Sequence, residues 1–232
     1  MSHYVFTPQE PPSVAVRGQS TRYAVSRIFC VGRNYAAHAR EMGGNPEREL
    51  PFYFTKPANA LVPSGGAIAY PPGTKNYHYE MELVIAIGAP VFRVPVNDAL
   101  AAVWGYAAGL DMTRRDLQAE AKAAGRPWDL AKGFEQSAVM TELVPASAAG
   151  HLSKGRSELA VNGVTKQQSD LADMIWSVPE IVANLSQYYH LQPGDLIYTG
   201  TPEGVGAVQP GDQITGEIEG LPALSLKILA AE

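Results

Sequence analysis

The sequence predicts a mixed α+β domain in which strands outnumber helices. Its 22 glycines and 18 prolines are spread along 232 residues, which is typical of many short strands joined by turns. The few predicted helices do not alternate regularly with the strands, which argues against a doubly wound sheet. Hydrophobic residues make up 46% of the chain and charged residues 18%, so a soluble protein with a substantial core is expected.

Two segments differ in character. Residues 1–25 are extended and proline-rich, and they predict a small N-terminal arm. Residues 26–232 contain the regular apolar patterns, and we expect them to form the main domain.

The first predicted strand covers residues 27–31 and ends at Gly32. Asn34 then opens a short predicted helix over residues 35–42, which Gly43-Gly44 should end, because asparagine is a good N-cap and glycine a good C′ residue.

Further along the chain, residues 52–56 alternate as a strand does, and the apolar run 83–87 predicts a buried strand. A short helix is expected over 97–103, followed by an apolar, strand-like run at 105–110.

Two helices carry start signals. Thr113 resembles a cap for a helix over 116–124, which Gly125 should end. Ser177, with a proline in the first turn and Glu180 at the third position, predicts a helix that continues to about residue 189.

Composition excludes several classes of protein. The net charge is −5 and no run of lysine or arginine exists, so a nucleic-acid footprint is not expected. No apolar stretch is long enough to span a bilayer, and the first residues lack the regions of a signal peptide. We therefore expect a cytoplasmic protein, with its single cysteine, Cys30, as a buried thiol.

The strongest chemical signal is a pair of glutamates, Glu80 and Glu82, at the start of the buried strand. Alternate residues of a strand share a face, so both carboxylates point the same way, about 7 Å apart at Cα. Like charges at an apolar strand need a cation between them, and oxygen ligands select Mg²⁺, Mn²⁺ or Ca²⁺. Asp111, at the end of another apolar run, would complete an open site. A solvated strand end is the alternative.

Other polar residues sit at positions suited to an anionic substrate. Arg115 and Gln118 lie three apart on one predicted helix and would hold a carboxylate and an oxyanion, unless that face is simply solvated. Lys132 lies among small and apolar neighbours and needs an anionic partner or exposure at the surface.

His38 and Glu41 are also three apart, on the helix predicted over 35–42. A carboxylate can orient a histidine as a general base acting on water, although such pairs are usually surface salt bridges. The loop 199–206 is rich in glycine and hydroxyls and could cradle an anion, but it matches no Walker or dinucleotide motif.

Taken in order, these segments resemble the fumarylacetoacetate hydrolase family. The resemblance covers roughly residues 25–230. The matching segments are Val31-Gly32-Arg33-Asn34-Tyr35-Ala36-Ala37-His38 with Glu41, Phe54-Thr55-Lys56-Pro57, Tyr79-Glu80-Met81-Glu82-Leu83, Gly105-Tyr106 through Asp116, Lys132-Gly133-Phe134, and Thr199 through Gly206.

The resemblance implies a mixed β-roll, a homodimer, and a lid that contains the His38–Glu41 helix. It implies Mg²⁺ or Mn²⁺ on Glu80, Glu82 and Asp111. The catalytic residues that it implies are His38, Glu41 and Lys132, and the substrate-binding residues are Arg33, Arg115, Gln118, Gly200 and Thr201.

The implied reaction is metal-dependent hydrolysis of the C–C bond of an acylpyruvate, a 2,4-dioxo acid. The N-terminal arm is similar to a bacterial branch of the family that converts fumarylpyruvate to fumarate and pyruvate in gentisate breakdown. Because the fold also supports decarboxylases, isomerases and hydratases, an oxaloacetate decarboxylase or another metal-enolate lyase is the alternative. A non-catalytic binding protein is a more distant one.

Overall fold

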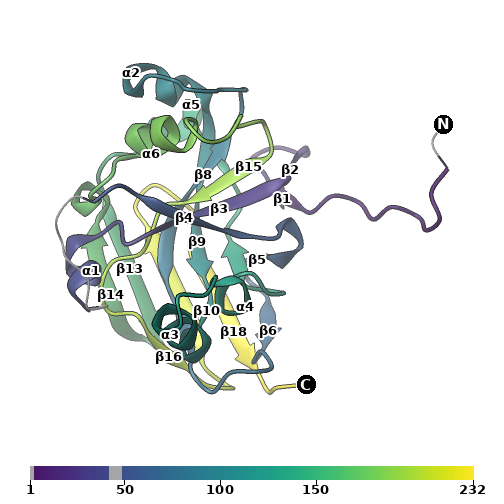
Figure 1. The fold of residues 1–232 in the computed structure, drawn as a ribbon, viewed down its shortest axis with the longest axis vertical. Coiled ribbons are helices and arrows are strands. Elements are labelled where there is room, and N and C mark those ends of the chain that lie inside the picture. The colour runs from purple at the N-terminus through teal and green to yellow at the C-terminus, as the bar shows by residue number, and fades with distance from the viewer. Residues whose placement is uncertain (1–2, 42–48) are drawn as a thin grey trace.

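Strands dominate the computed structural model, which describes residues 3–41 and 49–232 (Figure 1). Two large sheets, a three-stranded sheet and a two-stranded hairpin account for most of the regular structure, and short helices cover the edges. The predicted strand-dominated α+β fold is confirmed. Within the described residues no helix is both long enough and apolar enough to cross a membrane.

The largest sheet has eight strands and lies at the centre of the molecule. Its order is β4-β3-β15-β8-β9-β11-β5, and β12 also pairs with β9. All seven residues of β8 are buried, which explains why this segment reads as an uninterrupted apolar run. The strands are β3 (Arg27–Gly32), β4 (Phe52–Lys56), β5 (Leu61–Pro63), β8 (Met81–Ile87), β9 (Val103–Asp111), β11 (Ala138–Met140), β12 (Val144–Pro145) and β15 (Asp195–Tyr198).

A five-stranded sheet packs against one face of the large sheet. Its strands alternate between buried and exposed residues, and the buried side chains join one core with those of β8 and β9. In order across the sheet, the strands are β14 (Val164–Asp170), β13 (Arg156–Val161), β17 (Gln213–Ile218), β18 (Leu224–Leu229) and β6 (Ala67–Ala69).

The β13–β14 hairpin is an element that the sequence prediction missed. Its tip is Asn162-Gly163, and both residues have positive φ, at 51° and 77°. This dipeptide is the strongest short-range signal for a tight hairpin turn.

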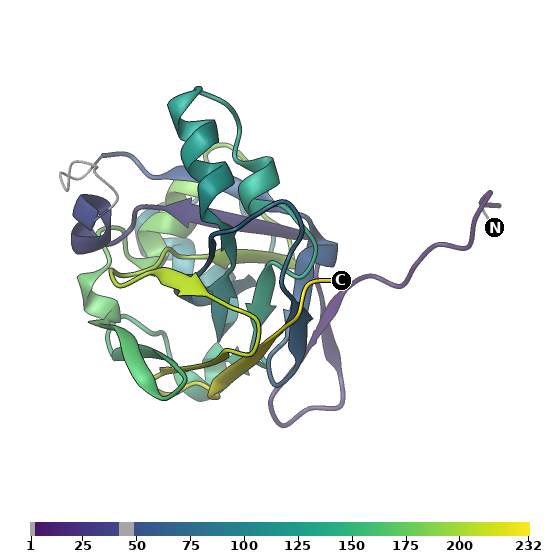
Figure 2. The same ribbon diagram turned by 90° about the horizontal axis from the view of Figure 1, so that it is seen from below.

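The smaller sheets lie at the margins. One consists of β10 (Thr113–Arg114), β7 (Tyr77–Tyr79) and β16 (Gly206–Val208), and the other of β1 (Ser13–Ala15) and β2 (Arg22–Ala24). Val14 and Val25 pack in a second core that also contains Cys30, which is buried as predicted. Residues 3–12 extend away from the body in both views (Figures 1 and 2).

The helices are short. They are α1 (Ala36–Glu41), α2 (Val96–Ala99), α3 (Arg115–Ala123), α4 (Asp129–Lys132), α5 (Ala146–Ala149) and α6 (Val178–Leu185), with 3₁₀ turns η1 (Ala58–Ala60), η2 (Leu100–Ala102) and η3 (Leu171–Asp173). Glu180 accepts a hydrogen bond from the Ser177 backbone N–H at 3.0 Å, as predicted for the start of α6. This helix ends at Leu185, earlier than expected, and the helix predicted over 97–103 is only α2 followed by η2.

Two predicted helix caps are wrong. The Asn34 side chain donates to the carbonyls of Trp176 and Thr199, both at 2.9 Å, and so joins distant loops. Thr113 lies in β10, and its hydroxyl contacts Lys132 at 2.6 Å. In both cases a tertiary partner takes the side chain that a local cap would use. The predicted helix stop at Gly43-Gly44 lies outside the described residues.

Candidate active site

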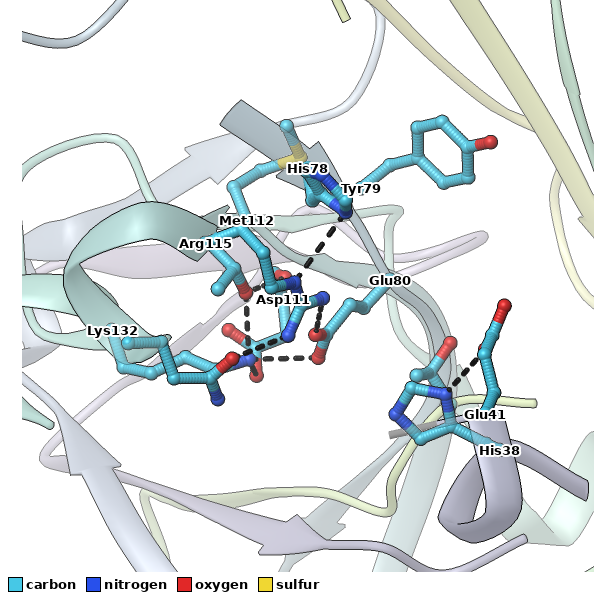
Figure 3. Close-up of polar contacts among 12 residues, drawn as sticks. His38, Glu41, His78, Tyr79, Glu80, Asp111, Met112, Arg115 and Lys132 are labelled. Carbon is cyan, nitrogen blue, oxygen red and sulfur yellow. Dashed lines mark hydrogen bonds and ion pairs between the residues drawn. The ribbon is translucent and has the colours of Figure 1, made fainter. Parts of the chain in front are cut away.

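Three buried carboxylates meet where β8 and β9 run side by side. Figure 3 shows two of them, Glu80 and Asp111, with their partners. The antiparallel register sets Met81 opposite Leu110, and the Asp111 N–H donates to the Glu80 carbonyl at 2.9 Å. Side-chain oxygens of Glu80, Glu82 and Asp111 consequently lie within 4.8 Å of one another. The structure thus brings together the three acids that the sequence analysis expects to form one site.

Lys132, on α4, bridges two of these acids. Its Nζ lies 2.7 Å from Glu80 Oε2 and 2.7 Å from Asp111 Oδ2. Burial opposes the charge on Lys132, yet Asp111 and Glu80 outweigh it and raise its pKa above the ordinary value. Both carboxylates therefore favour the charged ammonium form of Lys132.

Two further cations complete the charge balance around the cluster. Arg115 Nη2 donates to Glu80 Oε1, and Lys56 Nζ lies 2.8 Å from Asp111 Oδ1. Burial alone would raise the pKa of Glu80, but Lys132 and Arg115 lower it below the ordinary range. Lys56 is fully buried and was missed as a site residue, because a lysine at a strand end gives no sign of which carboxylate it will meet.

Glu82 is the carboxylate without a cation. Among the described residues it forms no ion pair, and its Oε2 accepts one hydrogen bond, from Gly200 N–H at 2.8 Å. Burial, Asp111 and Glu80 together raise its pKa well above the ordinary value. A buried acid repelled by two others, in an all-oxygen cluster, fits a hard divalent ion.

Arg115 is held by neighbours on two sides. Its Nη1 donates to Gln118 Oε1 on the same helix, so the Gln118 amide N–H₂ remains available as a donor. Its Nε donates to His78 Nδ1 at 3.4 Å, and His78 Nε2 pairs with Asn76 Oδ1 at 2.8 Å. Burial and Arg115 lower the pKa of His78 to about 4, so His78 is a neutral acceptor that fixes the guanidinium.

His38 and Glu41 form the predicted pair on α1. His38 Nδ1 lies 3.0 Å from Glu41 Oε2, and the His38 side chain is buried (Figure 3). Glu41 Oε1 also accepts from Gly204 N–H at 3.2 Å, so the loop after β15 holds the helix in place. A carboxylate on Nδ1 leaves Nε2 as the proton acceptor.

A cavity of about 420 Å³ adjoins this cluster. Glu80, Glu82, Lys132 and Arg115 form its inner end, and aromatic side chains form much of its wall. It is lined by Val31, Gly32, Arg33, His38, Phe52, Phe54, Glu80, Glu82, Arg115, Gln118, Ala119, Lys122, Ala123, Trp128, Lys132 and Thr201. Sequence reasoning missed Phe52, Phe54 and Trp128, because aromatic residues in a strand or loop resemble ordinary core.

Three predicted residues lie behind the cavity rather than on its lining. Asp111 is fully buried beneath Lys132, and Glu41 lies behind His38. Gly200 has φ of 95° and directs its N–H at Glu82, where a Cβ would meet that of Asn34 at 2.7 Å. Gly200 therefore positions Glu82.

Gln167, which sequence reasoning also missed, connects two parts of the site. Its Oε1 accepts from the N–H of Met81, and its Nε2 donates to Thr201 Oγ1 and the Pro202 carbonyl, all at 2.9–3.0 Å. Met81 separates the two glutamates, and Thr201 lines the cavity. One buried amide thus fixes the strand that carries Glu82 relative to the loop that carries Thr201.

Comparison with known proteins places this geometry in a family context. Residues 27–229 match the family model described as "Fumarylacetoacetate (FAA) hydrolase C-terminal". The chain is similar to the fumarylpyruvate hydrolase of a Ralstonia species, with 58% identity over 184 residues, which cover 79% of this chain and 95% of that protein.

Two other relatives bear on the chemistry. The human mitochondrial oxaloacetate tautomerase FAHD1 is 42% identical over 201 residues, which cover 87% of this chain and 90% of that protein. The crystal structure of the Pseudomonas aeruginosa fumarylpyruvate hydrolase in complex with Mn²⁺ and pyruvate superposes with a TM-score of 0.96 and 50% identity. That match covers 98% of this chain and all of the other.

Proposed function

The chain belongs to the fumarylacetoacetate hydrolase family, and on this premise we propose that it is a metal-dependent hydrolase that cleaves fumarylpyruvate to fumarate and pyruvate. The observation that carries the proposal is the buried carboxylate cluster at the inner end of a cavity that His38 also lines. Similarity to fumarylpyruvate hydrolases over nearly the whole chain supports the same substrate, and a role in gentisate breakdown follows from it.

Glu80, Glu82 and Asp111 would hold the divalent ion, with Mg²⁺ or Mn²⁺ as the working metal and Ca²⁺ as a substitute. The fit rests on three oxygen donors within 4.8 Å and on Glu82, which forms no ion pair among the described residues. When bound, the ion supplies positive charge that polarises a keto oxygen and stabilises an enolate.

His38 activates the water. Its Nδ1, held by Glu41, keeps the imidazole oriented while Nε2 takes a proton from a water that attacks the acyl carbonyl carbon. The C–C bond then breaks, the electron pair stays on the pyruvyl carbon as an enolate, and a proton returns to that carbon. Burial of His38 keeps competing bulk water away from the base.

Lys132 and Arg115 surround the inner end of the cavity with positive charge. We assign them to the substrate carboxylate and the developing enolate, where charge-assisted hydrogen bonds are strongest. The Gln118 amide N–H₂ and the Thr201 hydroxyl, both on the cavity lining, orient the dioxo acid and its oxyanion.

The neighbouring reactions of the family use the same charges without an attacking water. A tautomerase moves a proton within oxaloacetate, and a decarboxylase releases CO₂ from it; the 42%-identical human relative is named an oxaloacetate tautomerase. The His38–Glu41 pair over the cavity favours hydrolysis here, because only hydrolysis requires a base that deprotonates water.

A substrate panel tests the function. Purified protein is assayed on fumarylpyruvate, maleylpyruvate, acetylpyruvate and oxaloacetate, each with Mg²⁺ and with Mn²⁺, and after chelation. We expect the highest kcat/KM on fumarylpyruvate and its loss on chelation. Faster turnover of oxaloacetate than of every acylpyruvate would contradict the proposal.

For organisation we propose that residues 26–232 are the catalytic unit, with residues 1–25 as an arm, and that the enzyme is a cytoplasmic homodimer. Family membership supports the dimer, and the extended residues 3–12 expose Tyr4, Val5 and Phe6, apolar side chains that a second copy would cover. Light scattering at micromolar concentration should give twice the chain mass of 24.9 kDa. A monomer mass would refute the dimer.

A further inference from the structure

We infer that Arg33 binds a second carboxylate, at the end of the substrate farthest from the metal site, and so makes the enzyme selective for dicarboxylic acylpyruvates. The inference rests on the proposed function and adds to it a specificity-determining residue. It is carried by the position of Arg33 in the cavity, by the absence of an anionic partner for it within residues 3–41 and 49–232, and by its backbone conformation.

A row of aromatic rings leads from the carboxylate cluster to Arg33. Lys132 Nζ lies 5.0 Å from the centre of the Phe54 ring, at the inner end. Trp128 contacts both Phe54 and Phe52, with ring centres 5.8 and 5.3 Å apart. Arg33 Cζ lies 5.6 Å from the centre of the Phe52 ring, at the outer end.

The spacing of this row follows from β4. Phe52 and Phe54 are two residues apart on the strand, so their side chains share a face and their Cα atoms are about 7 Å apart. A flat, conjugated acyl chain such as a fumaryl group fits along such rings. Its terminal carboxylate would then lie on the side of Arg33, while the pyruvyl end lies with Lys132.

Arg33 is the cation on this cavity that lacks an acidic partner in the described residues. Its guanidinium makes no ion pair and no hydrogen bond with residues 3–41 or 49–232, and its Cζ lies 5.6 Å from the centre of the Phe52 ring. Lys132 and Arg115, by contrast, are paired with Glu80. A planar guanidinium on an apolar wall offers two parallel donors to a carboxylate.

The backbone at Arg33 is also unusual. Its φ is 57°, in the left-handed region that non-glycine residues seldom adopt. The preceding Gly32 has no room for a Cβ, which would lie 2.0 Å from Phe52 Cζ. This turn therefore sets the Arg33 side chain over the Phe52 ring, and the strained conformation is retained where a side chain must be aimed.

The test compares two substrates that differ only at the distal end. One is fumarylpyruvate, and the other is the analogue with a methyl group in place of the distal carboxylate. Arg33→Met should lower kcat/KM for fumarylpyruvate about 10- to 100-fold more than for the methyl analogue, as expected for the loss of a charge-assisted contact. Arg33→Lys should restore part of the preference. Weaker inhibition by fumarate in Arg33→Met is the second readout.

Arg93→Met is a matched control. Arg93 also has a positive φ, at 52°, and its Cζ lies 4.9 Å from the centre of a phenylalanine ring, that of Phe92, but it does not line the cavity. The Arg93→Met variant should show the same ratio of kcat/KM for the two substrates as the wild type. The inference would be overturned if Arg33→Met lowered kcat/KM equally on both substrates. It would also be overturned if Lys122→Met, at another basic residue of the lining, removed the preference for fumarylpyruvate while Arg33→Met kept it. A wild type that cleaves neither substrate would instead refute the proposed function.

Discussion

Replacing His38 with alanine is expected to lower kcat on fumarylpyruvate by about 10²- to 10⁴-fold, the usual contribution of a general base. His38 lines the cavity, its Nδ1 is held by Glu41 at 3.0 Å, and it is the one histidine of the described residues on that lining. Binding of Mn²⁺, measured by calorimetry, should remain, because His38 is not among the three carboxylates that we propose as metal ligands.

Glu41→Gln should cost less than His38→Ala, because it removes the orienting charge but keeps the base. His190→Ala is a suitable control, since His190 is exposed and stacks on Phe92 away from the cavity. If His38→Ala turns over fumarylpyruvate at nearly the wild-type rate, water activation by this pair is wrong, and a metal-enolate lyase becomes the better assignment.

Glu82→Gln is expected to abolish Mn²⁺ binding and to lower kcat on the order of 10³-fold or more, since metal stabilisation of charge contributes several kcal/mol. Calorimetry and turnover measure the two losses. Glu217→Gln, an exposed change on β17, is the control. Tight Mn²⁺ binding by Glu82→Gln would show that the ion lies elsewhere.

In the metal-free protein, by contrast, Glu82→Gln should stabilise the fold. Burial and the neighbouring Asp111 raise the folded-state pKa of Glu82 well above 4.5. Between 4.5 and that raised pKa the folded state holds the proton more tightly than the unfolded state, so stability falls as pH rises through this interval. A glutamine at this position does not titrate, so the variant does not lose this stability as the pH rises.

Thermal unfolding in EDTA from pH 5 to pH 8 measures this effect. The Tm of Glu82→Gln minus that of the wild type should increase with pH. With added Mn²⁺ the wild type should have the higher Tm, because the ion stabilises only the protein that binds it. A Tm difference independent of pH in EDTA would show that Glu82 is ionised in the metal-free fold.

The sequence predicted the parts of this protein that depend on regular patterns. The period of two of extended chain places Glu80, just before β8, on the same face as Glu82 within it. The apolar run of β9 ends at Asp111, so pairing of the two strands brings the acids together. The family and the fold are confirmed. The roles of the individual site residues stay predictions.

What the sequence could not provide are partners that only the tertiary fold brings close. Lys56 meets Asp111 across 55 positions of chain, and Asn34 reaches Trp176 across 142. No local pattern signals such pairs. The misassigned caps at Asn34 and Thr113 have the same cause, because a side chain suited to capping also suits any buried carbonyl or ammonium group that reaches it.

The hairpin β13–β14 has a consequence for how this family can change in length. In β14, Gln167 is buried while its neighbours Lys166 and Gln168 face solvent. One residue inserted before Gln167 within the strand would turn the amide outward and present a lysine or another polar residue to Met81 and Thr201. The turn at Asn162-Gly163 lies beyond the paired residues, and length added there need not alter the strand. Variation in length among relatives should therefore accumulate at the turn, and the spacing from Val164 to Gln167 should stay constant.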